Sequence, residues 1–249
     1  MARQRYLPHA PITEALIDIQ VTPREGLDFA GLKDALDAAK FDYYLKGPIS
    51  FNTFAINVAT NGQLPQTTTE SQQLGLRFHS TDEKYVAQCR LNGFTLSRLP
   101  PYEKWSNLVD ETRRIWKLYI ELLGPTRVTR VATRFINNLN LPIEPGGSYQ
   151  KYLCKFVDVP EEAPQAVEAF VQRFQLVDVD TGARMALTLA LDGMSPDGTA
   201  PVMLDLDAFT GANLHPADEQ LWSILERLRD LKNRSFFGTI TETTAELYE

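Results

Sequence analysis

The second half of the chain opens with a long segment of alternating polar and apolar residues, RVTRVATRFINNLNLP (127–142). A period of two is typical of a β-strand with one face against a core. On such a strand one face holds Arg130, Ala132, Arg134, Ile136 and Asn138, and the other holds Val131, Thr133, Phe135, Asn137 and Leu139. We therefore expect a central strand with two arginines side by side on one face.

Other strands and helices are predicted on both sides of this segment. In the first half, periodicity predicts a strand at 14–21, a helix at 28–40, extended stretches at 50–60, 72–80 and 84–98, and a helix from Trp105 to Gly124. In the second half it predicts a short helix near 147–156, strands at 166–180, 183–192 and 201–208, a helix at 217–232, and an extended tail, FFGTITE (236–242).

The two halves follow a similar order of elements, although they share no residue-level repeat. The links between strands are of hairpin length, which favours antiparallel pairing. We predict an α+β protein of two similar lobes, 1–126 and 127–249, packed closely as one unit. Each lobe is expected to be a curved antiparallel sheet with long helices on one face, in a TATA-binding-protein-like or helix-grip-like arrangement.

Composition limits the class of protein. The chain has 249 residues, 43% of them hydrophobic, and a net charge of −7, values typical of a soluble globular protein without general affinity for DNA or anionic lipid. No apolar run reaches the ~20 residues that span a bilayer. The beginning of the chain lacks the apolar segment of a secretory signal, and the two cysteines are isolated, so we expect a cytoplasmic protein with free thiols.

The sequence contains no motif for catalysis or for a cofactor. We find no GxGxxG, GxxxxGK[ST], GxSxG, HExxH or EF-hand pattern, and the three histidines are scattered. These observations favour a non-enzymatic binding protein with no cofactor and no metal, whose partner is another protein or a small ligand.

The paired arginines allow two interpretations. Arg130 and Arg134 could together hold a carboxylate or phosphate ligand, or they could form an ion-pair ladder between the lobes, with Arg134 meeting an acid such as Glu14 or Asp207. Asp205 and Asp207, in LDLDAF (204–209), share one strand face. They could bind a hard cation, pair with the arginines, or face water.

A second group of cations lies in the first half. Arg77 and His79 share one strand face and Arg90 lies on the next strand, so with Lys84 and Arg98 they could form a basic patch. Interleaved aromatic residues are typical of nucleic-acid platforms. Ordinary alternation, with aromatics inward and cations outward, explains the same pattern.

The tail offers a different kind of contact. If FFGTITE (236–242) is a strand, then Thr239, Thr241 and Glu242 line an exposed edge. Such an edge can pair with a second copy of the chain, so we expect a homodimer.

Three segments together resemble a sporadically distributed family of bacterial proteins with no established activity. They are YLPHAPITEALIDI (6–19), RVATRFINNLNLP (130–142) and LRDLKNRSFFGTITE (228–242). The resemblance implies an association with mobile or defence genes. The family-like residues are Glu14, Arg130, Arg134, Asn137, Asp205, Phe237 and Thr241.

Three hypotheses about function follow. The first is a non-enzymatic cytoplasmic protein that binds a protein or ligand, as a homodimer. The second is a nucleotide or nucleic-acid binder that uses Arg77, Arg90, Arg130 and Arg134 on the concave sheet face. The third is a metal-dependent phosphoesterase built on Asp205 and Asp207.

Overall fold

The computed structural model describes residues 1–39, 41–57, 66–143, 147–155, 159–160 and 162–249. The first half of the chain contains β1 (Ile12–Thr22), α1 (Phe29–Ala38), β2 (Tyr44–Asn57), β3 (Gln66–His79), β4 (Tyr85–Arg90), β5 (Gly93–Arg98) and α2 (Trp105–Leu123). The second half contains β6 (Arg127–Leu141), the 3-10 turn η1 (Tyr149–Lys151), β7 (Ala169–Val177), β8 (Arg184–Asp192), β9 (Ala200–Leu214), α3 (Gln220–Thr239) and α4 (Glu242–Glu246).

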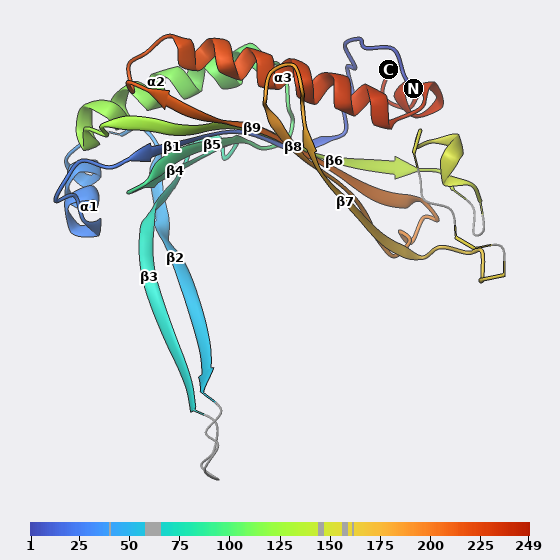
Figure 1. Ribbon diagram of the computed structural model, residues 1–249, viewed down its shortest axis with the longest axis horizontal. Helices are drawn as coiled ribbons and strands as arrows, with labels where there is room; N and C mark the ends of the chain where they lie inside the picture. Colours follow the sequence, from blue (N-terminus) through green and yellow to red (C-terminus); the bar gives the residue numbers. More distant parts are fainter. Residues whose placement is uncertain (40, 58–65, 144–146, 156–158, 161) are drawn as a thin grey trace.

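The strands join into one antiparallel sheet. In the described part of the chain its order is β2-β3-β4-β5-β1-β6-β9-β8-β7, so β1 and β6 meet in the middle (Figure 1). The α+β class with a large antiparallel sheet is therefore confirmed. Gln20 of β1 lies opposite Arg130 of β6, and Asp207 of β9 lies opposite Arg134. This register puts the arginine face of β6 beside polar positions of both neighbouring strands.

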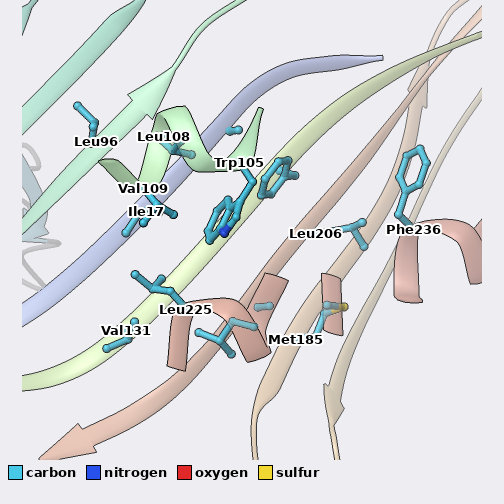
Figure 2. Close-up of a cluster of buried hydrophobic side chains, with 14 of the residues drawn as sticks. Ile17, Leu96, Trp105, Leu108, Val109, Val131, Met185, Leu206, Leu225 and Phe236 are labelled. Carbon is cyan, nitrogen blue, oxygen red and sulfur yellow. The ribbon is translucent and has the colours of Figure 1, made fainter. Parts of the chain in front are cut away.

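Helices α2 and α3 cover the same face of the sheet, which we call the covered face; we call the opposite one the open face (Figure 1). The apolar stripe of α2 runs from Trp105 to Leu123, where Gly124 in the left-handed conformation ends the helix. Figure 2 shows the core that results. Leu225 of α3 lies there beside Val131 of β6, and Trp105 of α2 packs against Phe135 of the same strand.

The predicted stretch at 84–98 is two strands, β4 and β5, joined by a turn at residues 91–92. Gly93 begins β5 at a point where the backbone of β1 comes close. A Cβ atom at this position would lie 2.7 Å from the carbonyl oxygen of Ile19. The glycine therefore allows close pairing with β1 as well as a bend after the turn.

The prediction of an edge strand in the tail is wrong. Residues 236–239 belong to α3, and Thr241 is the N-cap of α4. Phe236 continues the buried stripe of α3, so the apolar period in this segment is 3.6 and not two. Thr239 is buried, and Thr241 lines no strand edge. The proposed dimer contact therefore loses its structural basis in the tail.

The remaining elements differ from prediction mainly in length. The helix expected at 217–232 extends to Thr239, and the helix expected near 147–156 is the short turn η1. Residue 40 of the predicted helix at 28–40, residues 58–60 of the predicted strand at 50–60, and residue 156 lie outside the described residues. Within the described residues, no helix combines the length and apolar character needed to cross a bilayer.

Candidate functional site

An ion-pair network occupies the centre of the open face. Asp18 of β1 accepts hydrogen bonds from Arg90 Nη2 at 2.6 Å and from Arg130 Nη1 at 2.9 Å. Arg130 also reaches Asp207 of β9, with Nη2 3.5 Å from Oδ2. Thr95 donates its hydroxyl to Asp18 at 2.7 Å. This network links β4, β5, β1, β6 and β9 across the middle of the sheet.

Arg134 makes a separate, two-point contact. Its Nε and Nη2 donate to the two carboxylate oxygens of Asp205 at 2.8 and 2.7 Å. These bonds raise the pKa of Arg134 above its already high ordinary value. The partner of Arg134 is thus Asp205, one of the two aspartates that were expected to be able to pair with the arginines, and not Glu14 or Asp207.

The candidate metal ligands are engaged by these arginines. Asp205 is held by Arg134, and Asp207 lies beside Arg130. Burial raises the pKa of Asp207, against the opposing effect of Arg130 and Arg134. Among the described residues, no group of three or more possible ligands gathers at one point. The geometry therefore gives the phosphoesterase hypothesis no support.

Acidic side chains engage two of the three residues predicted to contact nucleic acid, Arg77, His79 and Arg90. Arg90 is paired with Asp18, and His79 Nδ1 lies 2.6 Å from the Glu83 carboxylate, while Arg77 is exposed. Burial, and then the nearby cations, lowers the pKa of His79. Arg98 lies on the covered face instead, buried, with Nη2 bonded to the carbonyl of Pro101.

A cavity opens on the covered face, where the N-terminal segment, the start of α2, the second half of α3 and β6 meet. Its volume of about 690 Å³ is that of a small-molecule site. We call it the Lys232 cavity. Its lining consists of Gln4, Arg5, Tyr6, Leu7, Pro8, Ala10, Ile12, Tyr102, Glu103, Lys104, Trp105, Ser106, Asn137, Arg229, Lys232, Asn233, Phe236 and Phe237.

Lys232 is the most unusual group in this lining. It is only 8% exposed, and its Nζ lies 3.6 Å from the centre of the Phe135 ring. Among the described residues, no carboxylate forms an ion pair with this amine and none accepts a hydrogen bond from it. Burial, with a smaller contribution from Arg229, lowers its pKa to about 7. An amine of this kind is a frequent feature of functional sites.

Asn137 supplies a second polar group. It is 2% exposed and lies on the same face of β6 as Phe135, opposite to the arginines. Its Nδ2 donates to the carbonyl of Leu204 at 3.0 Å. Its Oδ1 receives no hydrogen bond from any described residue, which leaves an acceptor for a guest in the cavity. Asn137 therefore belongs with Lys232 and not with the ion-pair network.

The rim of the cavity is cationic and aromatic. Trp105 Nε1 donates to Glu226 at 2.6 Å, and Arg229 touches the same carboxylate only loosely, at 3.5 Å. Lys104 is exposed and has no ion pair among the described residues. Glu103, the acid of the lining, is engaged by Arg98 at 3.2 Å. The rim thus holds more unengaged positive than negative charge.

Sequence reasoning missed Lys232, although a signal was present. The buried stripe of α3 runs through Leu221, Leu225, Leu228, Lys232 and Phe236, at helical spacing. A lysine in a stripe of otherwise apolar residues is a buried cation. The helix predicted at 217–232 ends at this position, so the prediction did not place Lys232 within a buried stripe that continues to Phe236.

No model of a protein family matches the sequence, and no curated protein is significantly similar to it. The resemblance stated above therefore stays a prediction. Of its residues, Asn137 and Phe237 line the Lys232 cavity, and Arg130, Arg134 and Asp205 belong to the ion pairs of the open face.

Proposed function

We propose that this protein is a non-enzymatic, cytoplasmic binding protein that takes a small organic anion with an apolar body in the Lys232 cavity. The observation that carries the proposal is the buried amine of Lys232, which faces this cavity without a carboxylate partner among the described residues. Moving a charged amine out of water costs free energy, and the attraction of an anion bound beside it would offset that cost.

The composition of the cavity supports an amphipathic ligand. Trp105, Phe236 and Phe237 offer apolar walls, while Arg229 and Lys104 offer positive charge at the rim. A ligand with an apolar body and one carboxylate would satisfy both parts. Tyr6, which is 71% exposed, lies at the solvent side of the lining.

The open face supports the alternative of nucleic-acid binding less well. Arg90, Arg130 and Arg134 each contact an aspartate, so phosphate groups would have to displace Asp18 or Asp205. The desolvated ion pairs support a role in joining the central strands. We therefore treat this network as a scaffold.

We also infer that the two halves of the chain are related lobes of the TATA-binding-protein-like or helix-grip-like kind. The strand order supports this inference, because β1-β5-β4-β3 and β6-β9-β8-β7 run outward in corresponding order. Each series is followed in the chain by a long helix, α2 or α3. Superposition of these two sets of elements tests the inference, since lobes of common origin should overlay with matching strand directions.

The binding proposal is tested by titrating the full chain calorimetrically with octanoate, octanol and octyltrimethylammonium. These probes share an apolar body and differ in head-group charge. We expect octanoate to bind at least about tenfold more tightly than the other two, a difference of about 1.4 kcal/mol. Equal affinity for all three would overturn the proposal.

Variants show where the octanoate binds. Lys232→Met and Arg229→Gln should each weaken octanoate binding several-fold. Arg173→Gln, which removes an exposed cation from β7, is the matched control and should leave octanoate affinity unchanged. Loss of affinity in the control alone would place the site elsewhere.

A further inference from the structure

We propose that Lys232 is a nucleophilic amine that condenses with the carbonyl group of a bound oxo acid and holds it as an imine. The inference rests on the proposed function, because it assumes that the Lys232 cavity takes organic anions. It adds the chemical class of the ligand, an aldehyde or ketone that also carries a carboxylate, and a covalent mode of binding.

The first support is the position of the amine. Lys232 is more than nine-tenths buried, yet it lines a cavity large enough for a small molecule. Its Nζ rests on the ring of Phe135, and no described residue accepts a hydrogen bond from it. A structural lysine in a core normally has a carboxylate or carbonyl partner. Here the nitrogen is left available to a guest.

The second support is the state of that nitrogen. Only an unprotonated amine has the lone pair that attacks a carbonyl carbon. The apolar surroundings of Lys232, together with Arg229, lower its pKa to about 7, so a large fraction is neutral at neutral pH. A fully exposed lysine side chain is in general almost entirely protonated under the same conditions.

The third support is the placement of groups for the rest of the ligand. Arg229 precedes Lys232 by three residues on the same helix and is held only loosely by Glu226, so it can bind a carboxylate. Asn137 Oδ1 can accept a hydrogen bond from the hydroxyl that forms during the addition. A carbonyl for Lys232 and a carboxylate for Arg229 together define an oxo acid.

The condensation is balanced without an oxidant or reductant. The Nζ lone pair forms a bond to the carbonyl carbon, and the carbonyl π electrons move to oxygen, which takes up the proton that nitrogen releases. The carbinolamine then loses its hydroxyl group and a second nitrogen proton as water while the C=N bond forms. The net change is one amine and one carbonyl converted to one imine and one water.

Reductive trapping tests the proposal on the full-length chain. The protein is incubated at neutral pH with para-carboxybenzaldehyde and sodium cyanoborohydride, which adds hydride to the imine carbon and fixes it as a secondary amine. Peptide mapping by mass spectrometry then locates the adduct. We expect one main adduct, on Lys232, formed at least about tenfold faster than on any other lysine.

Variants and competitors make the result specific. Lys232→Met should lose the main adduct, whereas Lys117→Met, a matched change on the exposed side of α2, should keep it. Arg229→Gln keeps the amine but should slow labelling by para-carboxybenzaldehyde several-fold more than labelling by para-methylbenzaldehyde. Octanoate should protect Lys232 from both aldehydes.

The outcomes separate this inference from the proposed function. Labelling spread over exposed lysines and the N-terminal amine, with octanoate still bound in the cavity, would overturn the imine and leave the binding proposal standing. Selective labelling of Lys232 without octanoate binding would support the role of Lys232 as a nucleophile. It would contradict the proposal that the cavity binds a simple anion with an apolar body. If neither labelling nor octanoate binding occurs, both proposals are wrong.

Discussion

The Nζ atom of Lys232 lies 3.6 Å from the centre of the Phe135 ring, which joins α3 to the central strand β6 on the covered face of the sheet. The ring face attracts the positive charge but accepts no conventional hydrogen bond. Because the amine has this ring below it and a cavity beside it, its charge is poorly compensated. The affinity of Lys232 for a proton is therefore lower than that of an ordinary lysine.

Replacing Lys232 by methionine should stabilise the protein at neutral pH. The folded-state pKa of about 7 is below the ordinary value of 10.5, so the unfolded chain binds more protons between these two values. The penalty is fully present below pH 7 and disappears as the pH rises toward 10.5. At about 1.36 kcal/mol per pKa unit, the fall from 10.5 to about 7 corresponds to roughly 5 kcal/mol, which is the most that Lys232→Met should gain at pH 7.

Urea unfolding at pH 7 and at pH 10 measures this difference. The other charged groups around the cavity, Arg229, Lys104, Glu103 and Arg5, are the same in both proteins. Lys117→Met should change the free energy of unfolding by less than about 0.5 kcal/mol at either pH. A gain for Lys232→Met that did not shrink with rising pH would contradict the assigned protonation state.

Removing Arg134 should destabilise the fold without affecting the cavity. Arg134→Met leaves the Asp205 carboxylate, which is buried, without its two-point partner. Because Arg134 itself is half-exposed, we expect a loss of about 2 kcal/mol, less than for a fully buried pair. The double variant Arg134→Met/Asp205→Leu should recover most of that loss. Chemical denaturation of the original protein, Arg134→Met, Asp205→Leu and the double variant gives the coupling energy.

Octanoate affinity distinguishes a scaffold from a ligand site on the open face. If the Arg134–Asp205 pair only holds strands together, Arg134→Met binds octanoate as the original protein does. A weakened affinity in a fully folded Arg134→Met protein would place part of the ligand site on the open face.

Binding in the Lys232 cavity should change the fluorescence of Trp105. Its indole forms part of the cavity wall, with Nε1 fixed on Glu226, whereas Trp116 bonds to the carbonyl of Pro216 and lies outside the lining. Octanoate should therefore alter the emission of the original protein, and Trp105→Phe should lose at least about half of this change. Calorimetry should show that Trp105→Phe still binds octanoate, which separates loss of the reporter from loss of the site.

Thr241 should stabilise the end of the chain as a helix cap. Its hydroxyl accepts from the Thr244 amide and donates to the carbonyl of Lys151 at 2.7 Å. Thr241→Ala should cost about 1 kcal/mol, and Thr241→Ser should retain most of the stability. Faster amide hydrogen exchange in α4 of Thr241→Ala, measured against Thr241→Ser, is the expected signature. An edge strand at this position would show no such dependence on the hydroxyl.

Local periodicity was enough to predict most elements. The alternation of 127–142 predicted β6 with its two faces, and the stripe from Trp105 to Gly124 predicted α2 with its end. Such patterns persist in the sequence because one face of each element must be apolar. The prediction for the tail was wrong because Phe236 and Phe237 fit a short strand as well as the last turns of a helix. Only the full buried stripe of α3 distinguishes the helix from the strand.

The sequence by itself determined the α+β class, the two faces of the central strand and the presence of paired arginines and aspartates on that strand and its neighbour. Only the tertiary structure decided which aspartate meets which arginine. Asp207 lies directly opposite Arg134, yet Arg134 bonds to its diagonal neighbour Asp205, and Arg130 likewise reaches Asp18 diagonally. It also decided that a lysine in the stripe of α3 faces a cavity without a counter-ion among the described residues. The surroundings of Lys232 come from segments that are far apart in the chain. A local sequence pattern does not show how close such segments lie in the folded protein.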